Sequence, residues 1–96
     1  MSNLIYNNSI FTMATLIEIA KDLANSFILA RNKKDAASHI IFEINRLVYS
    51  DSRQTFEFPV KMEIVKLIQE YISVKSKDSL VFLGTRDYIL KQLNAN

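Results

Sequence analysis

The sequence contains one pair of side chains with the spacing of an acid–base couple. His39 and Glu43 lie four residues apart and would share one face of a helix. A carboxylate beside an imidazole can hold it in position for proton transfer. His39 is the only histidine of the chain, so the sequence has no histidine pair for a metal ion. Both residues fall on the polar stripe of a predicted helix, and we interpret them as a solvated surface pair.

Three further carboxylates, Asp51, Glu57 and Asp87, would meet if the chain folds so that one end of a helical bundle gathers them. Bundles that bind metals supply Glu-x-x-His pairs from facing helices, and the sequence has no such pair. Its single glycine, Gly84, cannot form a glycine-rich phosphate loop. We therefore predict no catalytic residues, no metal and no cofactor, and we expect that the protein is not an enzyme.

The composition favours a small all-α domain. One glycine, one proline and no cysteine occur among 96 residues, which leaves few ways to make tight turns and bulges. The apolar content of 49% is enough for a core. No uninterrupted apolar run is long enough to span a membrane. The lack of cysteine and of signal-peptide features in the opening residues favours a cytoplasmic protein.

Apolar periodicity predicts a small antiparallel four-helix bundle over residues 13–96, preceded by a loose leader at residues 1–12. Thr15 or Thr12 is expected to cap the first helix, and Asp35 the second. The expected helices lie at about 13–30, 36–49, 59–74 and 80–93. Inward positions include Leu16, Leu23, Phe27, Ile40, Ile44, Leu47, Ile64, Ile68 and Ile72.

Gly84 leaves two alternatives for the last helix. The helix either continues through Gly84, which then permits close packing, or breaks there so that Thr85 caps a new helix. We favour the continuous helix, because a strand over residues 79–83 would have no partner.

Basic residues gather at two predicted turns, Arg31, Lys33 and Lys34 at one and Lys75 and Lys77 at the other. The formal net charge is only +2, far from the dense, one-sided basicity of a dedicated nucleic-acid binder. We expect no specific nucleic-acid partner. The alternative is a non-enzymatic phage- or plasmid-type regulator or adaptor that binds DNA weakly through these turns.

The run Phe-Glu-Ile-Asn-Arg-Leu-Val-Tyr at residues 42–49, followed by a polar loop and an amphipathic helix, resembles small bacterial immunity proteins. Enterocin A or pediocin-like immunity proteins are four-helix bundles of about this size, with a run similar to Asn-Arg-Leu-Val closing a long helix. Immunity proteins of the colicin D type, and some from contact-dependent inhibition systems, share an opening similar to residues 19–28 and an arginine such as Arg46 near the end of a helix. The resemblance covers about residues 16–72.

This resemblance implies a protein that binds and neutralises a cognate protein toxin or bacteriocin without catalysis. A nuclease toxin has a basic active site, so acidic residues near the 50–58 loop and neighbouring aromatic anchors would make the contact. The expected contact residues are Glu43, Tyr49, Asp51, Phe56 and Glu57. Phe56 alternatively closes the end of the core. Against a bacteriocin receptor complex, the last helix would act instead, through Arg86, Tyr88 and Lys91.

Overall fold

The computed structural model of the protein describes residues 13–49 and 52–95. These described residues form four helices, which confirms the predicted all-α class. Their bounds are α1 Met13–Leu29, α2 Lys33–Arg46, α3 Phe58–Lys75 and α4 Ser79–Ala95. The expected leader at residues 1–12 lies outside the described residues and stays a prediction.

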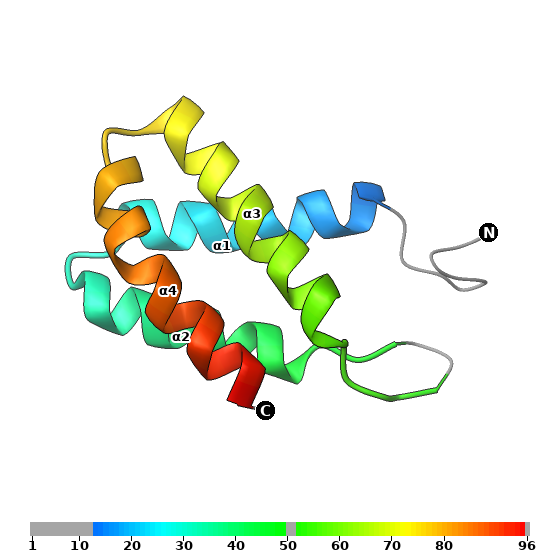
Figure 1. The fold of residues 1–96 in the computed structure, drawn as a ribbon. Helices are drawn as coiled ribbons and strands as arrows, with labels where there is room; N and C mark the ends of the chain where they lie inside the picture. The colour runs from blue at the N-terminus through cyan, green and yellow to red at the C-terminus, as the bar shows by residue number, and fades with distance from the viewer. Residues whose placement is uncertain (1–12, 50–51, 96) are drawn as a thin grey trace.

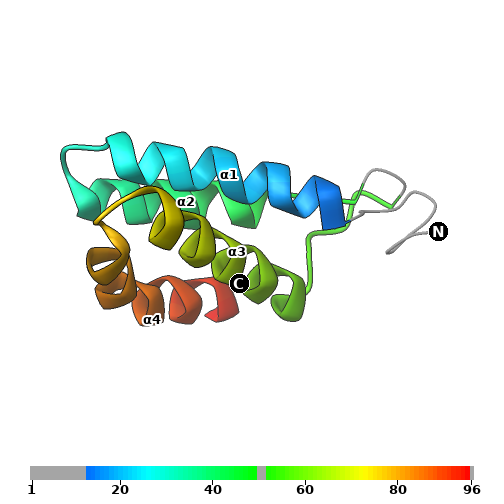
Figure 2. The same cartoon turned by 90° about the horizontal axis from the view of Figure 1, so that it is seen from above.

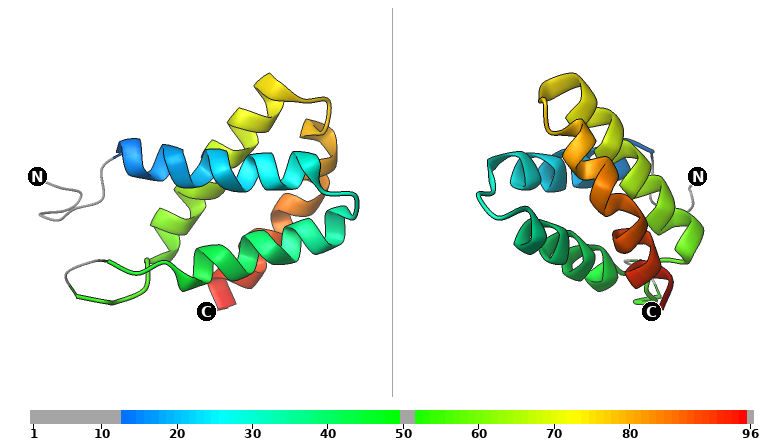
Figure 3. Two further views of the ribbon diagram at one scale, coloured as in Figure 1. Left: turned by 180° about the vertical axis from the view of Figure 1, so that it is seen from behind. Right: turned by 60° about the vertical axis from the view of Figure 1, so that its left-hand side comes forward.

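The helices form two antiparallel hairpins that pack face to face. α1 and α2 run side by side in opposite directions, and α3 and α4 do the same (Figure 1). Seen from above, the α1–α2 hairpin makes one layer and the α3–α4 hairpin the other (Figure 2). α3 crosses α1, and α4 packs against both α3 and α2 (Figure 3). The two hairpins therefore cross at an angle (Figure 3).

Apolar side chains from all four helices fill the space between the layers. Phe27 of α1 and Phe82 of α4 meet edge to face, with ring centroids 5.2 Å apart. Ile44, in the last turn of α2, is 0% exposed, as its position in the apolar stripe predicted. The largest fully buried side chains are Phe27, Phe82, Ile40, Ile44, Ile64, Ile68, Ile72, Ile89, Leu93 and Val65.

Two of the predicted N-caps are wrong. The side chain of Asn32 accepts a hydrogen bond from the Asp35 backbone N–H at 3.0 Å. α2 therefore begins at Lys33, and Asp35 lies inside its first turn. Thr15 likewise lies within α1, which begins at Met13. The alternative cap, Thr12, lies outside the described residues.

The end of α2 was also predicted too late. The helix ends at Arg46 because Leu47 takes an extended conformation, with φ −68° and ψ 135°. Val48 then forms an isolated antiparallel bridge with Thr55. Val48 and Thr55, one on each side of the connection between α2 and α3, thus lie side by side.

α4 continues through Gly84, as favoured from the sequence. The reason we considered for the glycine is wrong, however, because a Cβ built at Gly84 would meet no atom of the described chain within 4 Å. A glycine in an exposed helix interior costs about 1 kcal/mol relative to alanine. Packing against the described residues therefore does not explain Gly84.

Lys33 closes the carboxyl end of α1. Its Nζ donates to the backbone carbonyls of Phe27 at 2.7 Å, Ile28 at 3.2 Å and Ala30 at 2.8 Å. These carbonyls belong to the end of a helix, where the intrahelical pattern leaves acceptors without donors. The same ammonium lies 3.5 Å from a carboxylate oxygen of Asp78, in the turn before α4. Lys33 therefore links the start of α2 to the end of α1 and to the turn before α4, and its ammonium is not free for a partner.

We expect Lys33→Met to lower the free energy of unfolding by about 1.5–3 kcal/mol, because hydrogen bonds to charged groups contribute about that much. Lys34→Met is the matched control, since Lys34 is exposed at the next position; its effect should stay within about 0.5 kcal/mol. Urea denaturation at neutral pH measures both variants. Equal losses for the two would contradict the role given to Lys33.

Candidate functional site

The predicted contact loop joins the end of α2 to the start of α3. The hydroxyl of Tyr49 donates to Oε1 of Glu57 at 2.7 Å. Backbone hydrogen bonds, from the Tyr49 N–H to the Gln54 carbonyl and from the Arg53 N–H to the Tyr49 carbonyl, both 2.9 Å long, narrow the loop. The structure therefore brings two of the predicted contact residues together. A third, Asp51, lies outside the described residues.

Phe56 is not an exposed anchor. Its side chain is only 3% exposed and belongs to the core. The Tyr49 ring lies against it, with centroids 5.0 Å apart. The prediction of Phe56 as a contact residue is wrong, and the alternative, that it closes the end of the core, is confirmed. Of the two aromatics, Tyr49 alone is accessible to a partner.

The Tyr49 phenol is held in its neutral form. Partial burial, together with the hydrogen bond to Glu57 and the negative charge of that carboxylate, raises the pKa of Tyr49 to about 12. All three causes disfavour a phenolate. Because the folded-state pKa lies above the ordinary value of about 10, the stability that this group contributes is complete below pH 10. It is lost as the pH rises from about 10 to 12.

Tyr49 should therefore titrate later than an ordinary tyrosine. In an absorbance titration of phenolate, the difference between wild type and Tyr49→Phe is expected to show a midpoint near pH 12. Glu57→Gln keeps a hydrogen-bond acceptor but removes the charge, so it should lower this midpoint without restoring it fully, because burial is the largest cause. A midpoint at 10 in wild type would contradict both the partial burial of the phenol and its contact with Glu57.

Glu43 is engaged on its own helix. Its carboxylate accepts a hydrogen bond from Arg46 Nη1 at 3.0 Å. The Arg46 guanidinium also lies over the ring of Phe42, 5.3 Å from its centroid. Phe42 itself is 60% exposed. The interpretation of His39 and Glu43 as a solvated surface pair is only partly right: His39 is exposed, and the partner that the structure gives Glu43 is Arg46.

Phe42, Glu43 and Arg46 thus form one surface cluster, here called the α2 cluster. Sequence reasoning singled out Glu43 and missed Phe42. The available signal was position: Phe42 is an aromatic residue outside the apolar stripe of its helix, next to the polar positions 39, 43 and 46. An aromatic side chain on the polar side of an amphipathic helix is a candidate contact residue.

α4 exposes several large apolar side chains. Leu80 is 77% exposed and Tyr88 53%. Val81 and Leu83 are also exposed. Arg86, Tyr88 and Lys91 were the alternative contact residues, predicted for a bacteriocin receptor complex. Tyr88 and Lys91 are exposed, whereas Arg86 is half-buried against α3.

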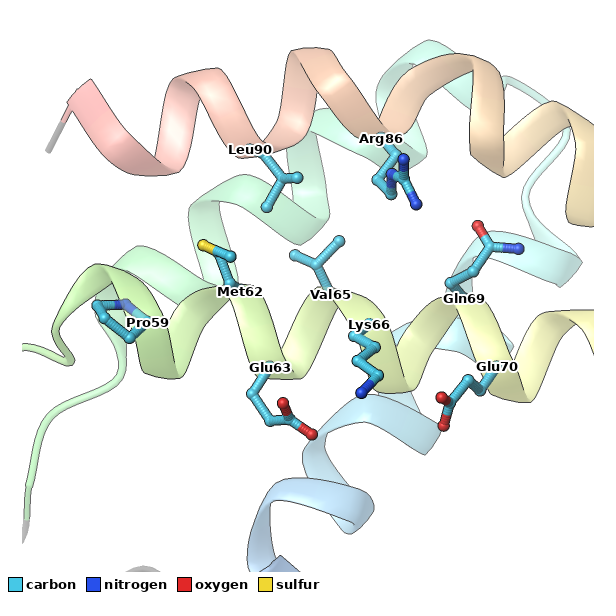
Figure 4. A pocket seen from close by; sticks show the side chains of 9 residues that line it. All are labelled: Pro59, Met62, Glu63, Val65, Lys66, Gln69, Glu70, Arg86 and Leu90. Atoms are coloured by element: carbon cyan, nitrogen blue, oxygen red, sulfur yellow. The ribbon is translucent and has the colours of Figure 1, made fainter.

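A pocket of about 440 Å³ lies between α3 and α4. Met62, Val65 and Gln69 point from α3 toward α4, while Leu90 and Arg86 point back from α4 (Figure 4). Glu63, Lys66 and Glu70 also line the pocket, but their side chains extend away from α4 (Figure 4). Gln69 Oε1 and Arg86 Nε are buried without a hydrogen-bond partner among the described residues. The pocket is thus mainly apolar, and its carboxylates do not converge on a common point as acid–base chemistry would need.

Within the described ranges, no group of three histidine, cysteine, aspartate or glutamate side chains is placed to hold a metal ion. Likewise, none of the described helices is long and apolar enough to cross a membrane.

Comparison with known proteins assigns no function to these surfaces. No protein-family model, no curated protein and no solved structure matches the chain. The function is therefore argued from the residues that carry the resemblance and from the exposed side chains described above.

Proposed function

We propose that the protein acts by binding another protein, and that this partner is a toxin or bacteriocin which it neutralises as an immunity protein. The observation that carries the proposal is the exposure of two aromatics, Phe42 at 60% and Tyr88 at 53%, on neighbouring helices. Both line the same hollow between α2 and α4. Exposed aromatics that flank a concave surface are typical anchors of protein contacts.

The mechanism is steric and electrostatic. A packed helical domain presents its surface without rearrangement and covers the functional surface of the toxin. The α2 cluster supplies an aromatic anchor with a charged pair beside it, and Glu57 adds a carboxylate held by Tyr49. Such charges set partner choice and the rate of association. The immunity assignment rests on the resemblance at residues 42–49, where Phe42, Glu43 and Arg46 all lie on the surface.

Weak DNA binding is the second candidate, and one observation favours it. The ion pair between Lys33 and Asp78 brings the turn before α2 beside the turn before α4, so the two groups of basic residues lie at the same end of the molecule. The Lys33 ammonium is already hydrogen-bonded within the protein, and Nζ of Lys75 lies 5.8 Å from the centroid of the Tyr71 ring. The remaining patch is small and mixed with Asp78, which fits nonspecific affinity at low salt.

The test is neutralisation of the toxin encoded beside this gene. Cells that express the toxin should recover growth when this chain is co-expressed, and the two purified proteins should form a one-to-one complex in calorimetry. A neighbouring repressor or integrase gene, together with tight binding to a defined DNA duplex, would overturn the proposal in favour of the regulator.

A further inference from the structure

A groove runs between α2 and α4, where two pockets of about 470 and 350 Å³ adjoin and share Ser38 and Tyr88. We call it the α2/α4 groove. Lys34 lies at one end and Arg46 at the other, twelve residues apart on α2, which corresponds to about 18 Å of helix. Phe42 and Tyr88 stand on its two sides as exposed aromatics.

Gly84 lies in the wall of this groove on α4. The described fold does not require glycine there, because the helix is continuous, φ of Gly84 is not positive, and an added Cβ would meet no described atom within 4 Å. The absence of a side chain leaves space at this point of the groove. It lets a second main chain approach α4 closely, and this accounts for a residue that otherwise only weakens the helix.

The charge of the groove selects its occupant. Among the described residues that line the two pockets, Lys34 and Arg46 are cationic and none is acidic. Arg46 shares its charge with Glu43, whereas Lys34 is exposed. A second copy of this chain, related by a two-fold axis, would set these cations against one another. A segment with carboxylates spaced to reach both ends is complementary.

The walls also select the conformation of the occupant. Both are formed by helices, whose backbone N–H and C=O groups are bonded within the helix. An extended peptide would find no ladder of free partners for its own backbone groups. A helical segment satisfies its backbone internally and offers an apolar face, which is the way amphipathic helices bind in grooves.

We propose that the α2/α4 groove binds an acidic amphipathic helix of the partner protein, with its apolar face between Phe42 and Tyr88 and its backbone close to Gly84. Its carboxylates pair with Lys34 and Arg46. This inference rests on the proposed function in one respect only: the protein acts through protein contacts. It adds the surface and the chemistry of the partner segment.

Fluorescence anisotropy with two designed peptides tests the groove. One peptide of about four helical turns carries leucines at helical spacing and glutamates elsewhere; the other has the same leucines with lysines in place of the glutamates. The acidic peptide is expected to bind at least tenfold more tightly. Gly84→Gln, which adds a neutral side chain to the open space, and Lys34→Glu should each weaken its binding at least tenfold.

Leu29→Gln is the matched control, because Leu29 is 81% exposed and does not line the groove; it should leave peptide binding unchanged. Circular dichroism confirms that each variant is folded, and Gly84→Gln should melt no lower than wild type because glutamine favours helix over glycine. Equal binding of the two peptides, or equal loss in Leu29→Gln, would overturn the proposal. Concentration-dependent self-association abolished by Gly84→Gln would overturn it in favour of a second copy.

The same variants separate this inference from the proposed function. If Gly84→Gln and Lys34→Glu still neutralise the toxin fully, the groove proposal fails and the immunity function stands. If the acidic peptide binds as expected but no toxin is neutralised, the groove proposal stands and the immunity function fails.

Discussion

Ile44→Ala is expected to lower the free energy of unfolding by about 2–5 kcal/mol, the usual range for removing a large buried aliphatic side chain. Ile44 is 0% exposed and lies within the single core cluster. Truncation leaves a cavity that the helices cannot close, since α2 is held by α1 on one side and α4 on the other. Small domains have a total stability of about 5–15 kcal/mol, so the loss should be plain in urea denaturation and in the melting temperature.

Phe42→Ala is the control for this prediction. Phe42 lies two residues earlier on the same helix and is 60% exposed, so its removal should change the free energy of unfolding by less than about 1 kcal/mol. The two variants should therefore have different effects. Ile44→Ala lowers the stability of the fold, whereas Phe42→Ala leaves the stability unchanged and lowers the affinity for the partner. A loss below about 0.5 kcal/mol for Ile44→Ala would contradict the placement of α2 in the core.

The helices and most of the core were predictable because they depend on periodicity. Apolar residues repeated at helical spacing identified the inward stripes, including Ile44, Ile64 and Ile68, which are all fully buried. The helix ends depend on single hydrogen bonds between competing side chains. Asn32 and Asp35 are both good caps, and only the geometry shows that Asn32 accepts from the Asp35 N–H.

The candidate site was predictable in part. Tyr49 and Glu57 were both predicted as contact residues near the 50–58 loop, and their hydrogen bond to one another emerges only from the structure. The burial of Phe56 was not determined by sequence, since an aromatic next to a turn can face either way. Lys33 was grouped with the basic residues of a turn, because its three carbonyl acceptors lie three to six residues back, at a helix end whose position only the fold defines.

Charge reversal on the α2 cluster and the adjoining loop is the second prediction with a large effect. Glu43→Lys and Glu57→Lys together are expected to lower toxin affinity by about three orders of magnitude or more. Removing one partner of a desolvated charge pair costs about 2–5 kcal/mol, and each 1.4 kcal/mol is a factor of ten. Calorimetric titration of the toxin with each single and the double variant measures the loss.

Glu57→Gln is the matched control for the loop, because it removes the charge while an amide oxygen can still accept from the Tyr49 hydroxyl. If Glu57→Lys and Glu57→Gln both lose affinity, the toxin recognises the negative charge of Glu57 and not the position of Tyr49. Melting curves should show each variant folded, since both carboxylates lie at the surface and not in the core. Unchanged affinity in the double variant would contradict a contact through these carboxylates.

The same measurements distinguish the immunity function from DNA binding. A DNA binder would be indifferent to Glu43→Lys and Glu57→Lys, or improved by them, because they add positive charge. It would respond instead to Arg31→Gln and Lys34→Gln, both exposed residues of the turn region before and within α2. Their neutralisation should reduce the salt dependence of duplex binding by about two units of slope. Lys33 is left intact, because its loss would weaken the fold itself. We expect weak duplex affinity that disappears at physiological salt, and tight duplex binding abolished by the two basic changes alone would overturn the immunity function.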